Sequence, residues 1–341
     1  MKKKATSTTL VLRRDEAAEL TRRVVDLTDA WLAGRNEKTK RGYLSDLNDF
    51  ARWLGEKETH TAVERLLQMG PGKANQTVML YIAAMKERKP SNRPAADDER
   101  LSSSTISRRI AALRSMIKIG RRIGMINWTL DVEVPKAEAR RDVRGPGLAD
   151  LQLINRAAAA MGDSPRARRD RAILALLFDL GLRRAELCGL DLADVEMNAN
   201  GLPATVAIVG KGHREKERLT VPDVTGQALA AWIEARGNHA GPLFERCDGR
   251  PVDPDVRLSG ETVRQVVERL GRAAGVGRTV RPHGLRHAAA TAALDAGKHV
   301  RDVKKFTRHS SLDMVLRYDD ARRDTAGEIA DLLSRRREER R

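Results

Sequence analysis

The sequence predicts a mainly α-helical protein of two domains, with a small β-sheet in the second. Apolar residues recur at helical spacing over most of the chain. The period changes at residues 204–210 and 217–222, two short β-rich runs typical of a hairpin or small sheet. The charged, proline-containing stretch 131–147 lacks apolar periodicity and is interpreted as a linker. A chain of 341 residues with 41% hydrophobic residues can fill two separate cores.

The first domain is expected to be helical and to follow a flexible, charged arm at residues 1–27. From residue 28 a helical pattern begins, with an apolar stripe at spacings of 4, 3 and 4: Tyr43, Leu47, Phe50 and Leu54. The opposite, polar face carries Lys40, Arg41, Asp46 and Arg52, and Lys40 and Arg41 are expected to contact DNA. A second helix is predicted over residues 75–88, and the two prolines of residues 89–100 indicate a loop.

The segment 102–124 completes this domain, which is predicted to end at residue 130. Serines at its start suit a helix N-cap, and Ile106, Ile110, Leu113 and Ile117 form its apolar stripe. The remaining surface is basic: Arg108, Arg109, Arg114, Lys118, Arg121 and Arg122. Such a face is either simply solvated or directed at DNA, and the net charge of the chain favours DNA.

The second domain, residues 148–341, is predicted to alternate helices with the small sheet. Helices are expected over 148–162 and 166–190 before the sheet, and over 261–275, 284–297, 300–309 and 311–320 after it. The C-terminal tail contains apolar residues, Ile329, Leu332 and Leu333, which suggest a docking helix.

The composition indicates a polyanionic partner. The net charge is +17 and the pI about 10.3, which favours nucleic acid, with an anionic membrane surface as the second candidate. Aromatic residues make up only 3%, too few for extensive base stacking, so contact with duplex phosphates fits better. Two cysteines, Cys188 and Cys247, are too few for a disulfide framework. The sequence shows no signal-peptide pattern and no membrane-span pattern, so we expect a cytoplasmic, nucleoid-associated protein.

Several polar residues are candidates for chemistry, each with a plainer alternative. Arg183 follows an apolar helix and needs an anion, which is either a substrate or the nearby Glu186. His283 and Arg286 share a helix face that suits a phosphate. Zinc at His283 and His287 is disfavoured, because no glutamate occupies the general-base position and Arg286 would stand beside the metal.

Near the C-terminus, His309 precedes Tyr318 by nine residues. Residues 309–312 look like a helix start, which places Tyr318 late in a short helix. Taken alone, such a tyrosine is usually packed with its hydroxyl in water.

Taken in order, these residues resemble the tyrosine recombinase, or phage integrase, family. Residues 180–187 ("LGLRRAEL"), the hairpin "GKG", "HGLRH", the later histidine and the tyrosine nine residues beyond it carry the resemblance from about residue 148 to the end. It extends more loosely to residues 39–54, similar to the start of that family's core-binding domain. The implied fold is a helical core-binding (SAM-like) domain followed by an α+β catalytic domain.

The resemblance also implies roles for individual residues. Arg183 and Arg286 correspond to the two catalytic arginines, and Tyr318 corresponds to the nucleophile. The other catalytic positions are Lys211 on the hairpin, His283 and His309; Glu186 and Asp194 would support the site. Further DNA contacts are expected from Arg214, Lys216 and Arg308.

The implied activity is site-specific cleavage and rejoining of duplex DNA through a 3′-phosphotyrosyl link, without metal or other cofactor. Four copies would act together on DNA, with the tail docking on a neighbour; accessory DNA-bending proteins are not predictable, and no membrane is involved. Type IB topoisomerase-like relaxation of DNA and a non-enzymatic DNA-binding protein are the alternatives. The chain departs from the family at Thr307 and Arg308, where Leu-Gly is usual.

Overall fold

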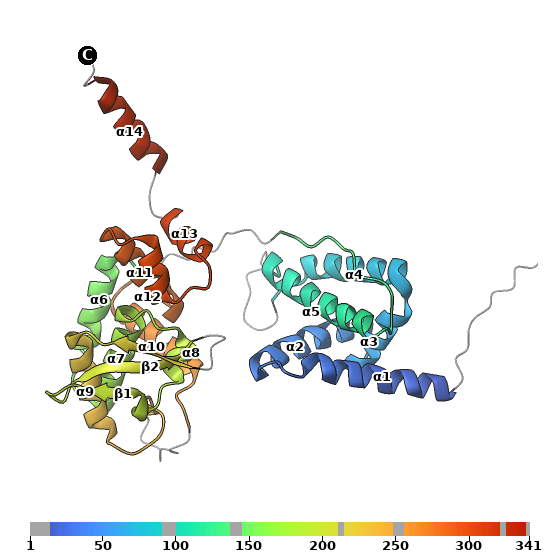
Figure 1. Ribbon diagram of the computed structural model, residues 1–341, viewed down its shortest axis with the longest axis horizontal. Helices are drawn as coiled ribbons and strands as arrows, with labels where there is room; N and C mark the ends of the chain where they lie inside the picture. The colour runs from blue at the N-terminus through green and yellow to red at the C-terminus, as the bar shows by residue number, and fades with distance from the viewer. Residues whose placement is uncertain are drawn as a thin grey trace, which may run out of the picture. The chain divides into compact units, whose positions relative to one another are not determined.

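The computed structural model describes residues 14–90, 100–136, 145–210, 215–247, 256–320 and 325–338 (Figure 1). By its contacts the chain divides into two compact units, Met1–Arg140 and Arg141–Arg341. The predicted fold class, mainly helical with one small sheet, is confirmed in the described residues. None of the described helices is long and apolar enough to cross a membrane.

All regular elements in the described part of unit 1 are helices. Its helices are α1 (Arg14–Leu32), α2 (Glu37–Leu54), α3 (Thr59–Gln68), α4 (Gly70–Glu87) and α5 (Ser103–Arg122). The side chains of Asn36 and Ser102 cap α2 and α5 by accepting hydrogen bonds from backbone N–H groups of the first turn. Gly55 ends α2 with φ 79°, a conformation that favours glycine. Of the predicted stripe, Leu47 and Phe50 are buried in the common core.

The predicted arm over residues 1–27 is wrong for its second half, because α1 begins at Arg14. Val24, Leu27 and Trp31 recur at spacings of 3 and 4, and all three are buried in the core of unit 1. The Trp31 indole also donates a hydrogen bond to Ser115 on α5. The charged residues around them, Arg22, Arg23, Asp26 and Asp29, are exposed, and in the sequence they obscure the apolar stripe.

A second correction concerns the polar face predicted for α2. Asp46 is buried, not solvated, and forms an ion pair with Arg108 of α5. Asp49, one helical turn later, accepts hydrogen bonds from the Tyr81 hydroxyl (2.6 Å) and from Arg109 (2.7 Å). Burial raises the pKa of Asp49, but hydrogen bonds from Arg88 and Tyr81 and the charge of Arg109 outweigh it, so the pKa is lowered. Two buried carboxylates therefore join α2 to α4 and α5.

Unit 2 encloses its own core. Its elements are α6 (Leu148–Ala159), α7 (Pro165–Asp179), α8 (Arg184–Cys188), η1 (Leu192–Asp194), β1 (Val195–Met197), β2 (Pro203–Val209), β3 (Lys216–Thr220), α9 (Asp223–Arg236), α10 (Gly260–Ala273), α11 (Pro282–Asp295), α12 (Val300–Thr307), α13 (Asp313–Asp320) and α14 (Thr325–Glu338). The described strands form one antiparallel sheet in the order β1-β2-β3. Val206 and Ile208 on β2 point into the helical core, where α7 is buried along its apolar side.

Candidate active site

Arg183 lies at the N-terminus of the short helix α8, with Glu186 one turn on. The Glu186 carboxylate accepts hydrogen bonds from the backbone N–H of Arg183 (2.8 Å) and from its Nη1 (2.6 Å). Burial alone would raise the pKa of Glu186, but these bonds and the charge of Arg308 lower it. Glu186 is therefore a fixed anion. It orients Arg183, whose side chain remains 26% exposed and can still meet a substrate.

Arg286 is held by the turn that ends α7. Its guanidinium is buried, and Nη1 donates a hydrogen bond to the carbonyl of Gly181. Gly181 has φ +54°, and a side chain there would meet the ring of Phe306 at 3.2 Å. Glycine is therefore needed at this turn for its backbone conformation and for space. The turn presents its carbonyl to a guanidinium on α11, 105 residues further along the chain.

His309 follows the C-terminus of α12 and is buried. Burial and then the positive charges of Arg286 and Arg183 lower its pKa to about 4, so the imidazole is neutral near pH 7. Those charges act on His309 because α8, α11 and the end of α12 converge here. The structure thus brings together four of the predicted residues, Arg183, Arg286, His283 and His309.

His283 lies in the first turn of α11 and is exposed. Partial desolvation and the charges of Arg286 and Arg183 lower its pKa, so it is neutral and able to accept a proton at pH 7. Its ring packs edge-on against His287, with 4.3 Å between centroids. Over the described ranges, no group of three or more His, Cys, Asp or Glu is placed to hold a metal ion.

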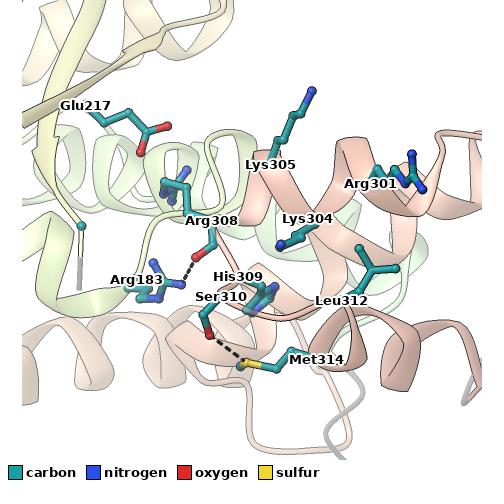
Figure 2. Close-up of a pocket in the computed structure, with 11 residues that line it drawn as sticks. Arg183, Glu217, Arg301, Lys304, Lys305, Arg308, His309, Ser310, Leu312 and Met314 are labelled. Atoms are coloured by element: carbon teal, nitrogen blue, oxygen red, sulfur yellow. Dashed lines mark hydrogen bonds between the residues drawn. The ribbon is translucent and has the colours of Figure 1, made fainter. Parts of the chain in front are cut away.

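A cavity of about 730 Å³ opens beside Arg183 and His309 (Figure 2). Its described lining includes five cationic side chains, Arg183, Arg301, Lys304, Lys305 and Arg308, but only one carboxylate, Glu217. Three of the cations, Arg301, Lys304 and Lys305, were not predicted from the sequence. Their positions on α12 at i, i+3 and i+4, with Arg308 at i+7, form a basic stripe that the same periodicity rule could have detected. The cavity is suited to an anion with several charges.

Comparisons with known proteins identify the family of this chain. The model of the phage integrase family matches residues 149–324, just over half of the chain. The chain belongs to the phage integrase family. It is accordingly an enzyme, a tyrosine-type site-specific recombinase.

Relatives with curated names cover nearly the whole chain. Tyrosine recombinase slr0733 of Synechocystis sp. is 34% identical over 88% of this chain and 91% of its own length. Tyrosine recombinase XerC of Mycobacterium tuberculosis is 30% identical over 85% of this chain and 91% of its own length. The match therefore includes unit 1 as well as the catalytic segment.

Solved structures share the fold. The XerH site-specific recombinase bound to palindromic difH substrate superposes with a TM-score of 0.63 at 16% identity, covering 96% of this chain and 91% of that one. A lambda integrase dimer bound to a core site gives 0.58 at 14%, covering 87% and 96%. At such identities the likeness concerns the fold alone.

Two predicted residues lie outside the described part of the chain: Lys211, expected to be catalytic, and Arg214, expected to contact DNA. The hairpin's other lysine, Lys216, forms an ion pair with the buried Asp194. Asp194 also accepts a hydrogen bond from the backbone N–H of Asp191 (3.0 Å). Lys216 is therefore engaged in holding the base of the hairpin.

The nucleophile position, Tyr318, lies in the second half of α13. The structure gives its backbone a helical conformation, as predicted, and its side chain lies outside the described part. The following Asp319 and Asp320 end the same helix.

The structure changes the picture for several residues predicted to bind DNA. Arg308 is only 9% exposed in its side chain and donates to Glu186 and to backbone carbonyls, so it serves the fold of the site. In unit 1, Arg109 is engaged with Asp49, and Arg114 donates to the carbonyl of Val132. Lys40 pairs with Glu37. In unit 1 the exposed members of the predicted basic set are Arg41, Arg108, Arg114, Lys118, Arg121 and Arg122.

Proposed function

We propose that this recombinase cleaves and rejoins duplex DNA through a 3′-phosphotyrosyl intermediate. The observation that carries the proposal is the convergence of Arg183, Arg286, His283 and His309 beside a cavity with five cations and one carboxylate. A DNA phosphodiester is an anion that gains negative charge in the transition state. Guanidinium groups bind its non-bridging oxygens in bidentate fashion.

In the proposed reaction the Tyr318 hydroxyl attacks the scissile phosphorus. A free tyrosine has a pKa of about 10, so it needs a proton acceptor at neutral pH. Neutral His283 is suited to take that proton, because its pKa is lowered. The bond between phosphorus and the 5′-oxygen breaks as the tyrosyl–phosphorus bond forms, and Lys211 donates a proton to the departing oxygen. A 5′-hydroxyl of a second strand then reverses the reaction and frees Tyr318.

The test is covalent capture of the enzyme on DNA. A binding site is first selected from a random duplex library, and nicks placed at successive positions then create suicide substrates. The wild-type chain should form a covalent adduct on one of them. Tyr318→Phe should bind the same DNA with equal affinity and form none. An adduct with Tyr318→Phe would disprove the assignment of the nucleophile, and relaxation of supercoils independent of the selected site would favour the topoisomerase alternative.

We further propose that four chains assemble on two DNA sites, with α14 docking on a neighbouring copy. Leu333 on this helix is 61% exposed, so this apolar side chain is available for contact with a neighbouring copy. Deletion from Thr325 onward should weaken the higher-order complex on DNA while leaving binding of a single site intact. A truncated chain that still assembles like the wild type would contradict the docking role.

A further inference from the structure

The two residues before His309, Thr307 and Arg308, stand where the phage integrase pattern usually has Leu-Gly. Thr307 is completely buried at the end of α12. Its hydroxyl donates a hydrogen bond to the carbonyl of Val303 (2.7 Å), the i−4 bond that threonine often makes in helices. The same oxygen lies 2.7 Å from Nδ1 of His309.

The single hydroxyl proton of Thr307 determines which tautomer of His309 is present. Because this proton is directed to Val303, the oxygen can only accept from His309, and Nδ1 must carry a hydrogen. In a neutral imidazole the other nitrogen, Nε2, is then unprotonated. A leucine in place of Thr307 has no oxygen to accept the hydrogen of Nδ1.

Arg308 has a left-handed backbone, with φ 53°, and is the one residue other than glycine with positive φ among those described. For an L-residue this conformation costs about 1–2 kcal/mol. Its side chain offsets that cost with hydrogen bonds from Nη1 to the carbonyl of Phe306 (2.8 Å) and from Nη2 to the carbonyl of Gly181 (3.0 Å). A further bond joins Nη2 to Glu186 Oε2 (3.1 Å).

These contacts connect Arg308 with both catalytic arginines. Its backbone carbonyl accepts a hydrogen bond from Nη2 of Arg183. Its side chain shares Glu186 with Arg183 and the Gly181 carbonyl with Arg286. One residue therefore joins the C-terminus of α12 to the turn after α7 and to α8.

We propose that Thr307 and Arg308 are positioning residues for the recombination reaction: Thr307 holds the His309 ring in place as its Nδ1–H tautomer, and Arg308 fixes Arg183 through Glu186 and its own carbonyl. This inference rests on the proposed function. The cleavage step itself involves neither Thr307 nor the Arg308 side chain.

The tautomer is measured without activity. In the DNA-free chain, ¹⁵N-edited NMR of the histidine rings should show His309 with a hydrogen on Nδ1; its signal is identified by its loss in His309→Gln. Thr307→Val, which has nearly the same shape but no hydroxyl, should show a mixture or the Nε2–H form. An Nε2–H form in the wild type, or an unchanged Nδ1–H form in Thr307→Val, would overturn the role of Thr307.

Arg308 is tested by Arg308→Gly, which keeps the carbonyl and suits positive φ but removes the side chain. At saturating suicide DNA, adduct formation should slow at least tenfold, while DNA affinity stays within about twofold. Guanidinium chloride at millimolar concentration should restore part of the rate in Arg308→Gly but have no such effect on the wild type or with matched sodium chloride. Arg308→Lys should stay slow, since an ammonium cannot bridge Gly181 and Glu186 together.

An Arg308→Gly rate equal to the wild type, or a slow rate that guanidinium does not raise, would overturn the role of Arg308. The proposed function fails separately: in that case the wild type itself forms no adduct. A wild type that forms the adduct, together with variants of equal rate, refutes only the positioning roles.

Discussion

Glu186→Gln is the change that tests most directly how the site is held together. The buried carboxylate accepts three hydrogen bonds, two from Arg183 and one from Arg308. A glutamine has one side-chain oxygen, which can keep the two hydrogen bonds now made to Oε2. Its NH₂ group would then face Nη1 of Arg183, and because both groups are donors no hydrogen bond can form between them. The variant removes the only charged partner that these two guanidinium groups share.

The expected loss of stability follows from the count of bonds. One hydrogen bond to a charged group, worth about 1.5–3 kcal/mol, disappears. The hydrogen bond from Arg308 remains, but its acceptor is now neutral, so it is roughly half as strong as the bond to the carboxylate. We therefore expect the free energy of unfolding of unit 2 to fall by about 2–4 kcal/mol at pH 7. Adduct formation on DNA should slow as well, because Arg183 loses its fixed orientation.

The assay is urea unfolding of the full chain, read by peptide-resolved hydrogen exchange, so that unit 1 serves as an internal control. Glu261→Gln, which removes a surface carboxylate paired with Arg264, is the matched control and should leave both units unchanged. Because the pKa of Glu186 is lowered on folding, its contribution is complete above about pH 4.5 and is lost as the pH falls through the folded-state value. A variant as stable as the wild type at pH 7, or a deficit that does not shrink in acid, would refute the reasoning.

Three further predictions follow from the described contacts. Tyr81→Phe removes the hydroxyl bonded to Asp49 and should destabilise unit 1 by about 1.5–3 kcal/mol, measured by the same exchange experiment; no change would mean that the bond contributes nothing. Replacing Lys304 and Lys305 together by alanine should weaken binding to all duplexes and reduce the slope of log K against log salt by about 2; an unchanged slope would place them away from DNA. The lowered pKa of His309, about 4 against 6.5 unfolded, means that the unfolded state binds more protons between these values. Unit 2 should therefore lose stability as the pH falls from 6.5 towards 4, and His309→Gln should lose less.

Much of the site was predictable because its residues lie at short, regular spacings. His283 and Arg286 share one turn of α11, and Tyr318 falls on a short helix after His309, as the patterns indicate. The basic stripe of α12 obeys the same periodicity, but Arg301, Lys304 and Lys305 belong to none of the family motifs. The regular spacing of apolar residues in α2 likewise predicted that Leu47 and Phe50 are buried.

Other features depend on contacts that no local pattern contains. The sequence pattern predicts that Asp46 is a solvated residue of α2. It is buried instead, and its charge is balanced by Arg108, 62 residues away in the sequence. The sequence pattern predicts that Arg308 contacts DNA. Its guanidinium instead donates a hydrogen bond to the carbonyl of Gly181, 127 residues away in the sequence. In both cases the sequence supplies the charge, whereas the fold decides whether a protein group or a substrate balances it.

This balance of charge explains how the site can be ordered and still attract a phosphate. Arg183 and Arg308 share the carboxylate of Glu186, and Arg286 donates a hydrogen bond to a neutral carbonyl. Arg183 and Arg308 are thus oriented by a group that balances only one of their two positive charges. Burial, and then the positive charges of Arg286 and Arg183, lower the pKa of His283 and His309. An additional carboxylate would orient the arginines as well but would compete with the substrate. Backbone carbonyls and one shared glutamate therefore orient the guanidinium groups before the substrate binds. The positive charge that Glu186 does not balance can then stabilise the negative charge that develops on a phosphate in the transition state.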